Sequence, residues 1–542
     1  MTSSELKINK KPLRFALPAI LVILVLMLSA PVFLGYQKAA PGNVFLGITG
    51  LYPEEQFYYL SIGPSQAVKG KLMFADRYGR IPDEQVLLNP IANAMALTAR
   101  VTNFPLTVVY NIFRVLSSLF LILCFYYLAR QFISSPFFII LAVLLYSFSA
   151  GFDWWFKLLH ISAIDAVDDS FPEANMFMAM SGEYYLPLAN ALFILTLTYS
   201  YKLFYKNEKV LLQCGVTLLA LGATYVYGLV PAVIIIAIVA IRNGYIEKTL
   251  TRNILRLLKL AIFCLPVTGY YLWLVFQFPV IDDNGWFALP SLASLLTTFG
   301  FCFFYSVAGL FFKKSEQLSK ELYLLFWLIT SILLIKIPQT ILPIQVQMLI
   351  GLGAPLAILS ATSLDLLGQA ISAKLYSLKI QRKNLLAGVV VFSLVALSFT
   401  TNLKFYMQQF HDLEKQSLPL YTTIPMYSAM EWSAKNISDD NLVIISRNLG
   451  IFYSALTASK VYCGLDYGEK SPEQIIVERA INLIRNNEVE KGKELFRETG
   501  ADYLFFDKNL GQGDFEQIRN TLKVNFKECY GNREVSIFQL KP

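Results

Sequence analysis

Long apolar runs separated by short basic segments constrain this chain more than any other feature. The first run extends from about Phe15 to Gly35 and follows a basic N-terminal segment. Roughly 20 apolar residues are enough for one helical crossing of a bilayer. The composition agrees, because 55% of the 542 residues are hydrophobic and only 15% are charged, whereas soluble domains carry about 25% charged residues. The sequence therefore predicts a polytopic membrane protein.

The apolar runs continue to residue 401 and predict about eleven crossings. One long run, Val210–Ile241, carries Gly228 and Pro231 and is predicted to form two short helices joined by a hinge. Lys and Arg are concentrated in alternate loops, which the positive-inside rule places in the cytoplasm. We therefore expect a multi-pass protein of the cell membrane with a cytoplasmic N-terminus and an external C-terminus.

The chain divides into two predicted domains at residue 401. Residues 1–401 are expected to form the transmembrane domain, with external loops at 36–104 and 151–180. Residues 402–542 have the composition of a soluble external α/β domain. Its strands are expected at 441–446, 503–507 and 535–540, and its helices at 472–487 and 489–498. The predicted fold class is an α-helical polytopic membrane protein with a C-terminal α/β domain.

The rarer residue types exclude several kinds of site. A net charge of +8 does not indicate a nucleic-acid partner, because Lys and Arg lie in short loops between apolar runs, where orientation signals fall. The only histidines are His160 and His411, so no His-rich metal site is predicted. Cys463 and Cys529 lie in the polar tail and would face an oxidising space. A disulfide between them is a hypothesis, since spacing alone does not bring their Cα atoms within about 7 Å.

Two adjacent carboxylates, Glu54 and Glu55, follow the first apolar run. Pro53 precedes them and aromatic residues follow, so the segment predicts a short helix on the membrane surface with the acids at its positive N-terminal end. Paired carboxylates beside a hydrophobic surface are candidates for a reaction centre. The structural alternative is that they only start the helix.

The second external loop carries a cluster of acids, at Asp165, Asp168, Asp169 and Glu173. The topology places them on the same side of the membrane as Asp76 in the first loop, so acids far apart in sequence can converge there. A metal site would need several oxygen ligands in a defined geometry. No cofactor is required by the sequence, and whether a divalent cation takes part stays open.

Arg114 lies about nine residues into the second apolar run, or about 13 Å deep at 1.5 Å per residue. A charge at this depth faces a cavity or a partner rather than lipid. Two alternatives stay open. The guanidinium either holds an anionic group or forms a structural ion pair with an external carboxylate.

Several of these motifs together carry a resemblance to a known family. They are the run Gly50-Leu51-Tyr52-Pro53-Glu54-Glu55-Gln56-Phe57-Tyr58-Tyr59-Leu60, the triplet Asp76-Arg77-Tyr78, the Arg114 helix, Pro172-Glu173-Ala174-Asn175 and the tail segment Gly500-Ala501-Asp502-Tyr503-Leu504-Phe505-Phe506. Over most of its length the chain resembles a family of prokaryotic polytopic membrane proteins that is similar to the GT-C glycosyltransferases. That resemblance implies transfer of a sugar from a polyprenyl-phosphate carrier to an acceptor on the external face, with a carboxylate of the first external loop in the reaction.

The resemblance also implies roles for particular residues. Glu55 falls where the family has its acid and would be the general base, while Glu54 or Asp169 would orient the sugar or a divalent ion. Arg114 would hold the phosphate as it leaves. The remaining expected substrate-binding residues are Asp76, Arg77, Tyr78 and Glu173. The implied partners are the polyprenyl-phosphate-linked sugar, a glycan, lipid or protein acceptor, and membrane lipid, with no nucleic acid.

Two departures from the family pattern favour a second hypothesis. Where relatives have an arginine pair after a proline, this sequence reads Leu342-Pro343-Ile344-Gln345, and where they have Pro-His it reads Tyr184-Tyr185-Leu186-Pro187. Missing cations remove electrostatic stabilisation of the leaving group, although Arg114, Arg77 or Arg80 are candidate substitutes. The alternative function is a non-catalytic lipid-linked glycan binder or transporter with the same fold.

Overall fold

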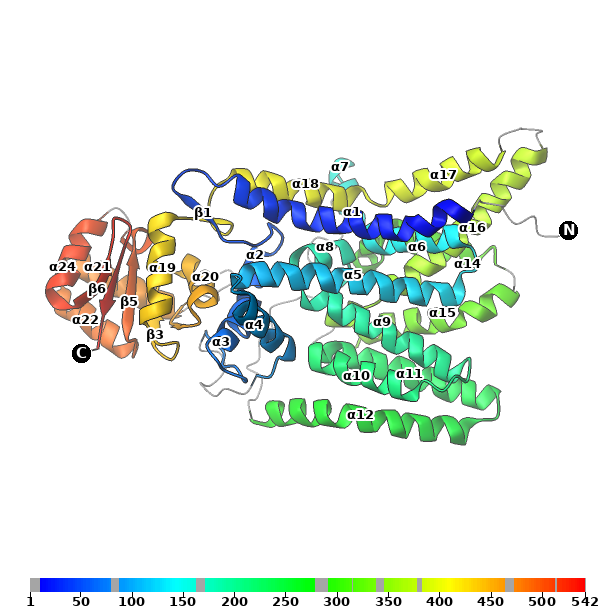
Figure 1. The fold of residues 1–542 in the computed structure, drawn as a ribbon, viewed down its shortest axis with the longest axis horizontal. Coiled ribbons are helices and arrows are strands. Elements are labelled where there is room, and N and C mark those ends of the chain that lie inside the picture. The colour runs from blue at the N-terminus through cyan, green and yellow to red at the C-terminus, as the bar shows by residue number, and fades with distance from the viewer. Residues whose placement is uncertain are drawn as a thin grey trace. The chain divides into compact units, whose positions relative to one another are not determined.

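The computed structural model describes residues 10–78, 87–161, 171–277, 291–313, 315–337, 346–377, 383–463, 472–511 and 514–541. The chain forms two compact units. The helical unit consists of Met1–Ala30 and Ile112–Gln409, and the mixed unit consists of Pro31–Asn111 and Phe410–Pro542. Figure 1 shows the elements of both.

The helical unit is built from a long series of apolar helices (Figure 1). Two of them, α1 and α5, also extend into the mixed unit. The helices are α1 (Lys10–Gln37), α5 (Leu106–Phe132), α6 (Pro136–Phe148), α7 (Asp153–Leu158), α8 (Met176–Gly182), α9 (Tyr185–Phe204), α10 (Leu211–Thr224), α11 (Val226–Ile246), α12 (Leu250–Gln277), α13 (Leu292–Thr298), α14 (Gly300–Leu310), α15 (Ser315–Ile335), η1 (Val346–Leu349), α16 (Gly353–Ser377), α17 (Lys383–Leu397) and α18 (Thr400–Glu414).

Fewer of these helices are long enough to cross a membrane than the sequence predicted. Within the described ranges, five helices have the required length and apolar composition, or up to seven if each of two bent pairs is one span. The predicted count of about eleven is therefore not confirmed. The difference arises in part because some apolar runs form shorter helices, namely Pro136–Phe148, Leu211–Thr224 and Glu321–Ile335.

The run that was predicted to be hinged does form two helices. Helix α10 ends at Thr224 and α11 begins at Val226, with Tyr225 in a non-helical conformation between them. The break precedes Gly228 and Pro231, and Pro231 is accommodated inside α11. Gly228 instead permits close packing, because a Cβ atom there would lie 3.2 Å from a side-chain atom of Ile350.

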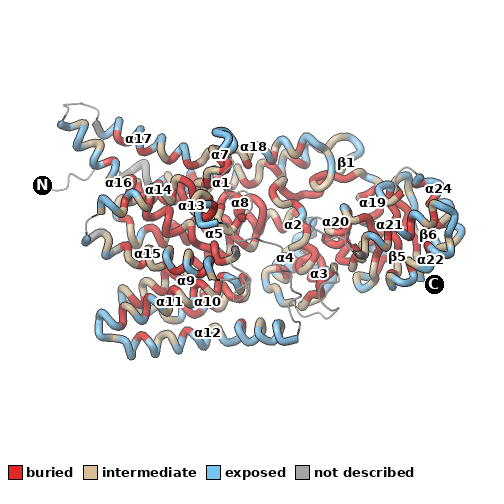
Figure 2. Tube along the Cα trace, turned by 180° about the vertical axis from the view of Figure 1, so that it is seen from behind, coloured by how far each residue is buried: buried red, intermediate tan, exposed pale blue. Residues whose placement is uncertain are grey.

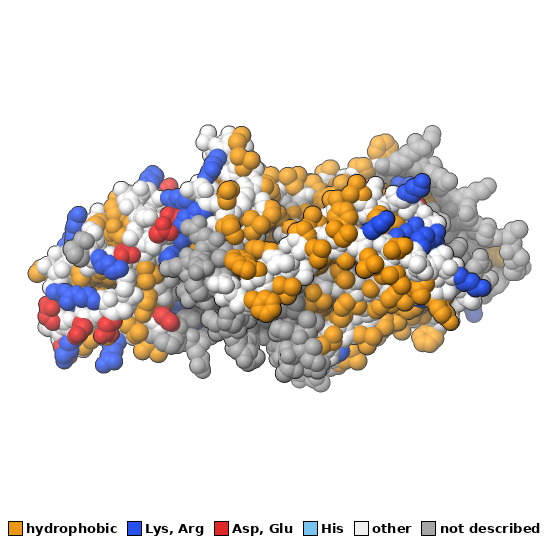
Figure 3. All heavy atoms as spheres, turned by 90° about the horizontal axis from the view of Figure 1, so that it is seen from below, with side chains coloured by type: hydrophobic (Ala, Val, Ile, Leu, Met, Phe, Trp, Pro, Cys, Tyr) orange, Lys and Arg blue, Asp and Glu red, His pale blue; other side chains and the backbone are white. Residues whose placement is uncertain are grey.

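Aromatic packing fills the core of the helical unit. Phe125 stacks on Tyr146 with ring centroids 4.1 Å apart, and the buried Trp327 packs against Phe193 at 5.6 Å. By contrast, α12 carries a largely exposed surface (Figure 2), where Leu265 is 64% exposed. Hydrophobic side chains also cover much of the face of this unit that Figure 3 shows. Such a surface is suited to lipid rather than to water.

The mixed unit joins the first long loop to the C-terminal tail. Its first elements are β1 (Asn43–Phe45), α2 (Pro53–Ser61), α3 (Pro64–Val68) and α4 (Pro90–Thr102). Its tail elements are β2 (Tyr421–Thr423), α19 (Ile424–Asn436), β3 (Leu442–Ile444), α20 (Arg447–Thr457), β4 (Lys460–Val461), α21 (Pro472–Arg485), α22 (Val489–Glu498), β5 (Tyr503–Asp507), α23 (Lys508–Gly511), α24 (Phe515–Asn525), β6 (Lys527–Gly531) and β7 (Val535–Gln539).

Strand pairing and ring packing hold the loop and the tail together. Strand β1 pairs antiparallel with β2, with Val44 opposite Thr422. Phe57 of α2 meets Phe452 of α20 edge to face, with ring centroids 4.8 Å apart. Both rings are nearly or fully buried, so each contributes apolar area as well as favourable aromatic geometry. Residues nearly 400 positions apart thus form one core.

The tail contains a five-stranded sheet in the order β4-β3-β5-β7-β6. Strands β4, β3 and β5 are parallel, and β7 runs antiparallel to both β5 and β6. The strands predicted near 441–446, 503–507 and 535–540 are confirmed as β3, β5 and β7, and the helices predicted at 472–487 and 489–498 as α21 and α22. Charged side chains of both signs cover this part in Figure 3, as expected for a water-facing surface.

The hypothesis of a Cys463–Cys529 disulfide is wrong. Both cysteines are free. Cys463 follows β4 at one edge of the sheet, whereas Cys529 lies in β6 at the other edge. Four strand spacings of about 4.8 Å separate the two edges by about 19 Å, far beyond the reach of a disulfide.

Candidate functional site

The paired acids occupy the first turn of α2, as the sequence predicted. Tyr52 precedes the helix in the left-handed conformation, with φ 48° and ψ 52°, and Pro53 is its first residue. Proline suits this position because its missing N–H would have no helical partner there. Glu54 is exposed and Glu55 is half-buried. Both carboxylates stand at the positive end of the helix dipole, which favours their ionised form.

The fully buried side chain of Gln56 fixes the loop that leads into α2. Its Nε2 donates to the Thr49 hydroxyl at 2.8 Å and to the Leu51 carbonyl at 2.5 Å, and its Oε1 accepts from the Thr49 N–H at 3.3 Å. A buried amide with several partners restrains both its own helix and the preceding loop. The sequence analysis missed this residue because a single Gln beside two Glu carries no periodic signal.

The triplet Asp76-Arg77-Tyr78 lies in the same unit and contacts the other end of α2. The Tyr78 hydroxyl is 2.7 Å from the hydroxyl of Ser61, and its ring lies 5.7 Å from that of Tyr58. Burial raises the pKa of Tyr78 well above its usual range, so its hydroxyl stays protonated. Asp76 is also buried. The first-loop residues singled out from the sequence are therefore brought together in the fold.

Arg77 joins this triplet to the tail. It is 1% exposed, its Nη1 donates to the Asp439 carbonyl at 3.0 Å, and its Nη2 lies 3.5 Å from the Asp439 carboxylate. The Arg77 carbonyl accepts from the N–H of Val461 in β4. These contacts anchor the backbone on both sides of the guanidinium.

Arg114 lies fully buried in α5 and donates to three backbone carbonyls. Its Nη1 bonds Met180 at 3.1 Å and Ser181 at 2.8 Å, and its Nη2 bonds Leu28 at 2.8 Å. Met180 and Ser181 form the last turn of α8, where unpaired carbonyls and the negative end of the helix dipole favour a cation. The prediction that Arg114 faces a partner rather than lipid is confirmed.

Acidic and amide side chains surround the two ends of α8. Glu173, half-buried before the helix, accepts from the Tyr225 hydroxyl at 3.2 Å. Asn175 caps its N-terminus, accepting from the Met178 N–H and donating to Asn402 at 2.8 Å. Glu183 follows its C-terminus and is fully buried. Glu183 was missed in the sequence, although a lone acid within the apolar stretch 176–204 is a recognisable signal of a buried function or pair.

The structure does not bring all predicted residues into view. Asp165, Asp168 and Asp169 lie outside the described residues, as do Arg80 and the segment Leu342-Pro343-Ile344-Gln345. Glu54, Glu55 and the Asp76 triplet belong to the mixed unit, while Arg114 and Glu173 belong to the helical unit. Within the described ranges, no group of three or more His, Cys, Asp or Glu side chains is placed to hold a metal ion.

Comparison with known proteins identifies the fold. No protein-family model matches the sequence, and no curated protein matches it either. Three membrane glycosyltransferases match the structure. The first is ArnT from Cupriavidus metallidurans, solved with undecaprenyl phosphate, at a TM-score of 0.54 and 9% identity over 98% of this chain and 99% of that one.

The second match is the arabinofuranosyltransferase AftD from Mycobacteria, at a TM-score of 0.56 and 13% identity over 99% of this chain and 40% of AftD. The third is the archaeal oligosaccharyltransferase AglB from Archaeoglobus fulgidus, solved with an inhibitory peptide and a dolichol-phosphate, at a TM-score of 0.51 and 12% identity over 92% of this chain and 70% of AglB. The shared architecture is that of the GT-C glycosyltransferases. This chain is a multi-pass membrane protein with that fold.

Proposed function

We propose that this protein is a membrane glycosyltransferase that moves a sugar from a polyprenyl-phosphate carrier to an acceptor. The observation that carries the proposal is the Glu54–Glu55 pair, held at the start of α2 by the buried Gln56. The fold supports it, because ArnT and AglB were solved with undecaprenyl phosphate and a dolichol-phosphate, respectively. The identity of the sugar and the acceptor is outside what the fold supports.

In the proposed reaction Glu55 is the general base. Its carboxylate takes the proton of an acceptor hydroxyl, whose oxygen attacks the anomeric carbon. The bond between that carbon and the phosphate oxygen breaks, and polyprenyl phosphate leaves with the bonding electron pair. Glu55 is assigned this role because it is half-buried, whereas Glu54 is exposed and is assigned to orient the sugar. Asp76, Tyr78 and Glu173 are proposed to line the substrate site, as is Asp169.

Arg114 and Arg77 have more than one role to reconcile. For Arg114 to hold the leaving phosphate, its guanidinium has to exchange carbonyl partners for phosphate oxygens, since three of its hydrogen bonds go to the backbone. We therefore assign Arg114 first to positioning α8. Arg77, bonded to Asp439, is likewise assigned to positioning the first loop against the tail.

The proposed reaction takes place on the external face, with the N-terminus in the cytoplasm. Basic side chains at one set of helix ends in the helical unit support this orientation. Lys206 bonds Gln131, Arg242 bonds Tyr205, and Arg256 bonds the carbonyl of Leu203. Lys and Arg predominate at one end of this unit in Figure 3, as the positive-inside rule expects of a cytoplasmic side.

A non-catalytic lipid-linked glycan binder is the second candidate. It is favoured by the start of α9, where the sequence has Tyr184-Tyr185-Leu186-Pro187. Tyr185 packs against Tyr225 with ring centroids 6.0 Å apart, so aromatic rings stand where relatives would supply a cation. Aromatic rings bind sugars and lipid chains but do not neutralise a leaving phosphate.

One assay separates the two candidates. The purified protein is supplied with polyprenyl-phosphate-linked sugars and a panel of acceptors, and release of polyprenyl phosphate is measured. Release by the wild-type protein that depends on Glu55 supports the transferase. Tight binding of the lipid-linked sugar with no release from any donor supports the binder.

A further inference from the structure

A polar pocket of about 340 Å³ lies within the mixed unit, in the C-terminal sheet domain. Its walls come from the segments that follow three parallel strands. Ser446 follows β3, Cys463 follows β4 and Asn509 follows β5. Strand β3 lies between β4 and β5, so the chain turns to opposite sides of β3 at this edge. In open α/β sheets, ligands bind outside the carboxyl ends of the strands at such a switch point.

Ser446 is the residue that most clearly indicates a ligand. It precedes α20 at the N-cap position, yet its side chain makes no capping hydrogen bond. The residue is 6% exposed, and its Oγ has no hydrogen-bond partner of acceptable geometry in the described part of the chain. It lies near the buried Asp507, whose raised pKa reflects desolvation that the Ser446 hydroxyl and nearby backbone N–H groups only partly oppose. A buried hydroxyl is normally satisfied, so this one has capacity to bind a group in the pocket.

The charges around the pocket are balanced. Arg485 is already engaged, with its Nε 3.1 Å from Asp514 and its Nη1 donating to Asn482 at 2.6 Å. The two remaining charged side chains of the lining are Arg447 and Glu478, whose formal charges of +1 and −1 cancel. This balance does not favour a small anion or a cation.

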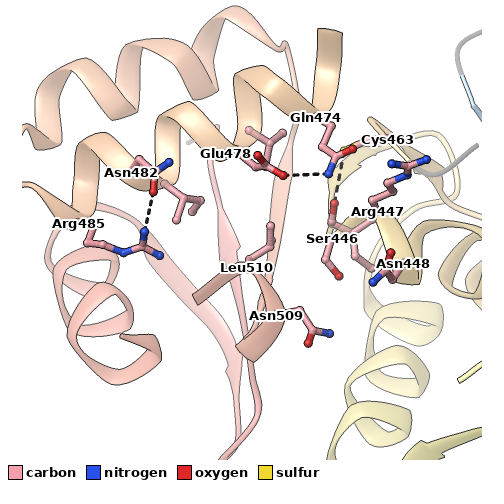
Figure 4. A pocket seen from close by; sticks show the side chains of 13 residues that line it. Ser446, Arg447, Asn448, Cys463, Gln474, Glu478, Asn482, Arg485, Asn509 and Leu510 are labelled. Carbon is pink, nitrogen blue, oxygen red and sulfur yellow. Dashed lines mark hydrogen bonds between the residues drawn. The ribbon is translucent and has the colours of Figure 1, made fainter. Parts of the chain in front are cut away.

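The uncharged polar side chains are mostly amides, contributed by Asn448, Gln474, Asn482 and Asn509. Each amide offers both a donor and an acceptor, which is also the property of a sugar hydroxyl. Figure 4 shows Asn509 and Ser446 on one side of the pocket and Gln474 and Glu478 of α21 on the other, with Gln474 donating to Glu478 at 2.9 Å. The volume lies in the lower part of the roughly 300–1,000 Å³ range of small-molecule sites.

We propose that this pocket binds an uncharged sugar unit and serves as a subsite for the glycan acceptor. The Ser446 hydroxyl and the Asn509 amide would hydrogen-bond adjacent sugar hydroxyls, while α21 closes the opposite wall. Assignment to the acceptor rests on the proposed transferase function, whereas binding of a sugar does not.

The test measures saturation transfer by NMR from the full-length protein in nanodiscs to ligand protons. The probes are methyl glycosides of glucose, galactose, mannose, N-acetylglucosamine and arabinose. We expect at least one to bind, with affinity reduced about two- to tenfold by Ser446→Ala and by Asn509→Ala, the range for loss of one hydrogen bond. The matched control is Asn486→Ala, an exposed Asn next to the end of α21 that does not line the pocket.

The outcomes separate the pocket from the catalytic proposal. Absence of binding by every glycoside, or equal binding by all four proteins, overturns the sugar pocket. A Ser446-dependent response to inorganic phosphate with none to the glycosides also overturns it, in favour of an anion site. Thermal unfolding checks that the variants fold, which is expected because Ser446→Ala removes no cap bond. Polyprenyl phosphate release is measured separately, so glycoside binding without release contradicts the transferase function and leaves the pocket intact.

Discussion

Two buried arginines illustrate how differently the two units satisfy a charge. Arg114 of the helical unit and Arg77 of the mixed unit are 0% and 1% exposed. Arg114 donates to three backbone carbonyls, two of them at the end of α8. Arg77 donates to one carbonyl and approaches Asp439, which also binds Lys71 at 2.7 Å. A helix end supplies the partner in an apolar bundle, and a shared carboxylate supplies it in a polar domain.

Replacing both arginines by leucine gives the largest expected effect. Arg114→Leu leaves three buried carbonyls without these donors, at about 1 kcal/mol or more each, so we expect a loss of about 3 kcal/mol. Arg77→Leu should cost only about 1–2 kcal/mol, because Asp439 keeps Lys71. Thermal unfolding of the purified proteins in detergent measures both.

The ranking of the two variants is the informative quantity. Equal shifts in the unfolding midpoint would show that the carbonyl contacts of Arg114 contribute no more than the Asp439 pair. Retention of full lipid-sugar binding and turnover by Arg114→Leu would show that this guanidinium neither positions the site nor holds the phosphate.

The adjacent glutamates test the mixed unit by its chemistry. Glu55→Gln preserves shape but removes the base, so turnover should fall about a hundredfold or more with the fold intact. Glu54→Gln should cost less, since Glu54 is exposed. The measurement is polyprenyl phosphate release, and the two variants serve as controls for each other. Undiminished release by both would exclude the pair as the base.

Gln56 tests how far the loop before α2 depends on one buried side chain. Gln56→Leu removes the bonds to Thr49 and Leu51 and leaves their polar groups buried, which should destabilise the protein by about 2 kcal/mol. Turnover should fall as well, because α2 carries the proposed base. Gln517→Leu on the exposed face of α24 is the control, with an expected change within about 0.5 kcal/mol. Similar midpoints for the two variants would contradict a restraining role for Gln56.

The smallest expected effect is the pH dependence of the Lys71–Asp440 pair beside Arg77. The hydrogen bond from Lys71 lowers the pKa of Asp440, so its contribution is present above the ordinary Asp pKa of about 3.9 and is lost as pH falls through the lowered value. The carboxylate is 68% exposed, so we expect roughly a few tenths of a kcal/mol. The difference in unfolding midpoint between wild type and Asp440→Asn should shrink from pH 6 to pH 3. A difference that grows on acidification would show the opposite sign.

The sequence by itself determined the features that depend on local pattern. Apolar runs and basic loops are enough to indicate a membrane protein, since lipid demands helices with satisfied backbones. Alternating and amphipathic patterns placed β3, β5, β7, α21 and α22, and the Pro53-Glu54-Glu55 segment indicated the start of a helix. Even the depth of Arg114 could be predicted, because one side chain's distance along a helix needs no tertiary information.

Only the tertiary structure decided which distant residues became partners. That Arg114 meets the end of α8, that Phe57 packs on Phe452, and that Cys463 and Cys529 stand at opposite sheet edges all follow from chain topology. The pocket beside Ser446 likewise exists only because three parallel strands end together. Such contacts join residues tens to hundreds of positions apart, and the free energy that selects them comes from burial and hydrogen bonding in the assembled core, which local sequence pattern does not record.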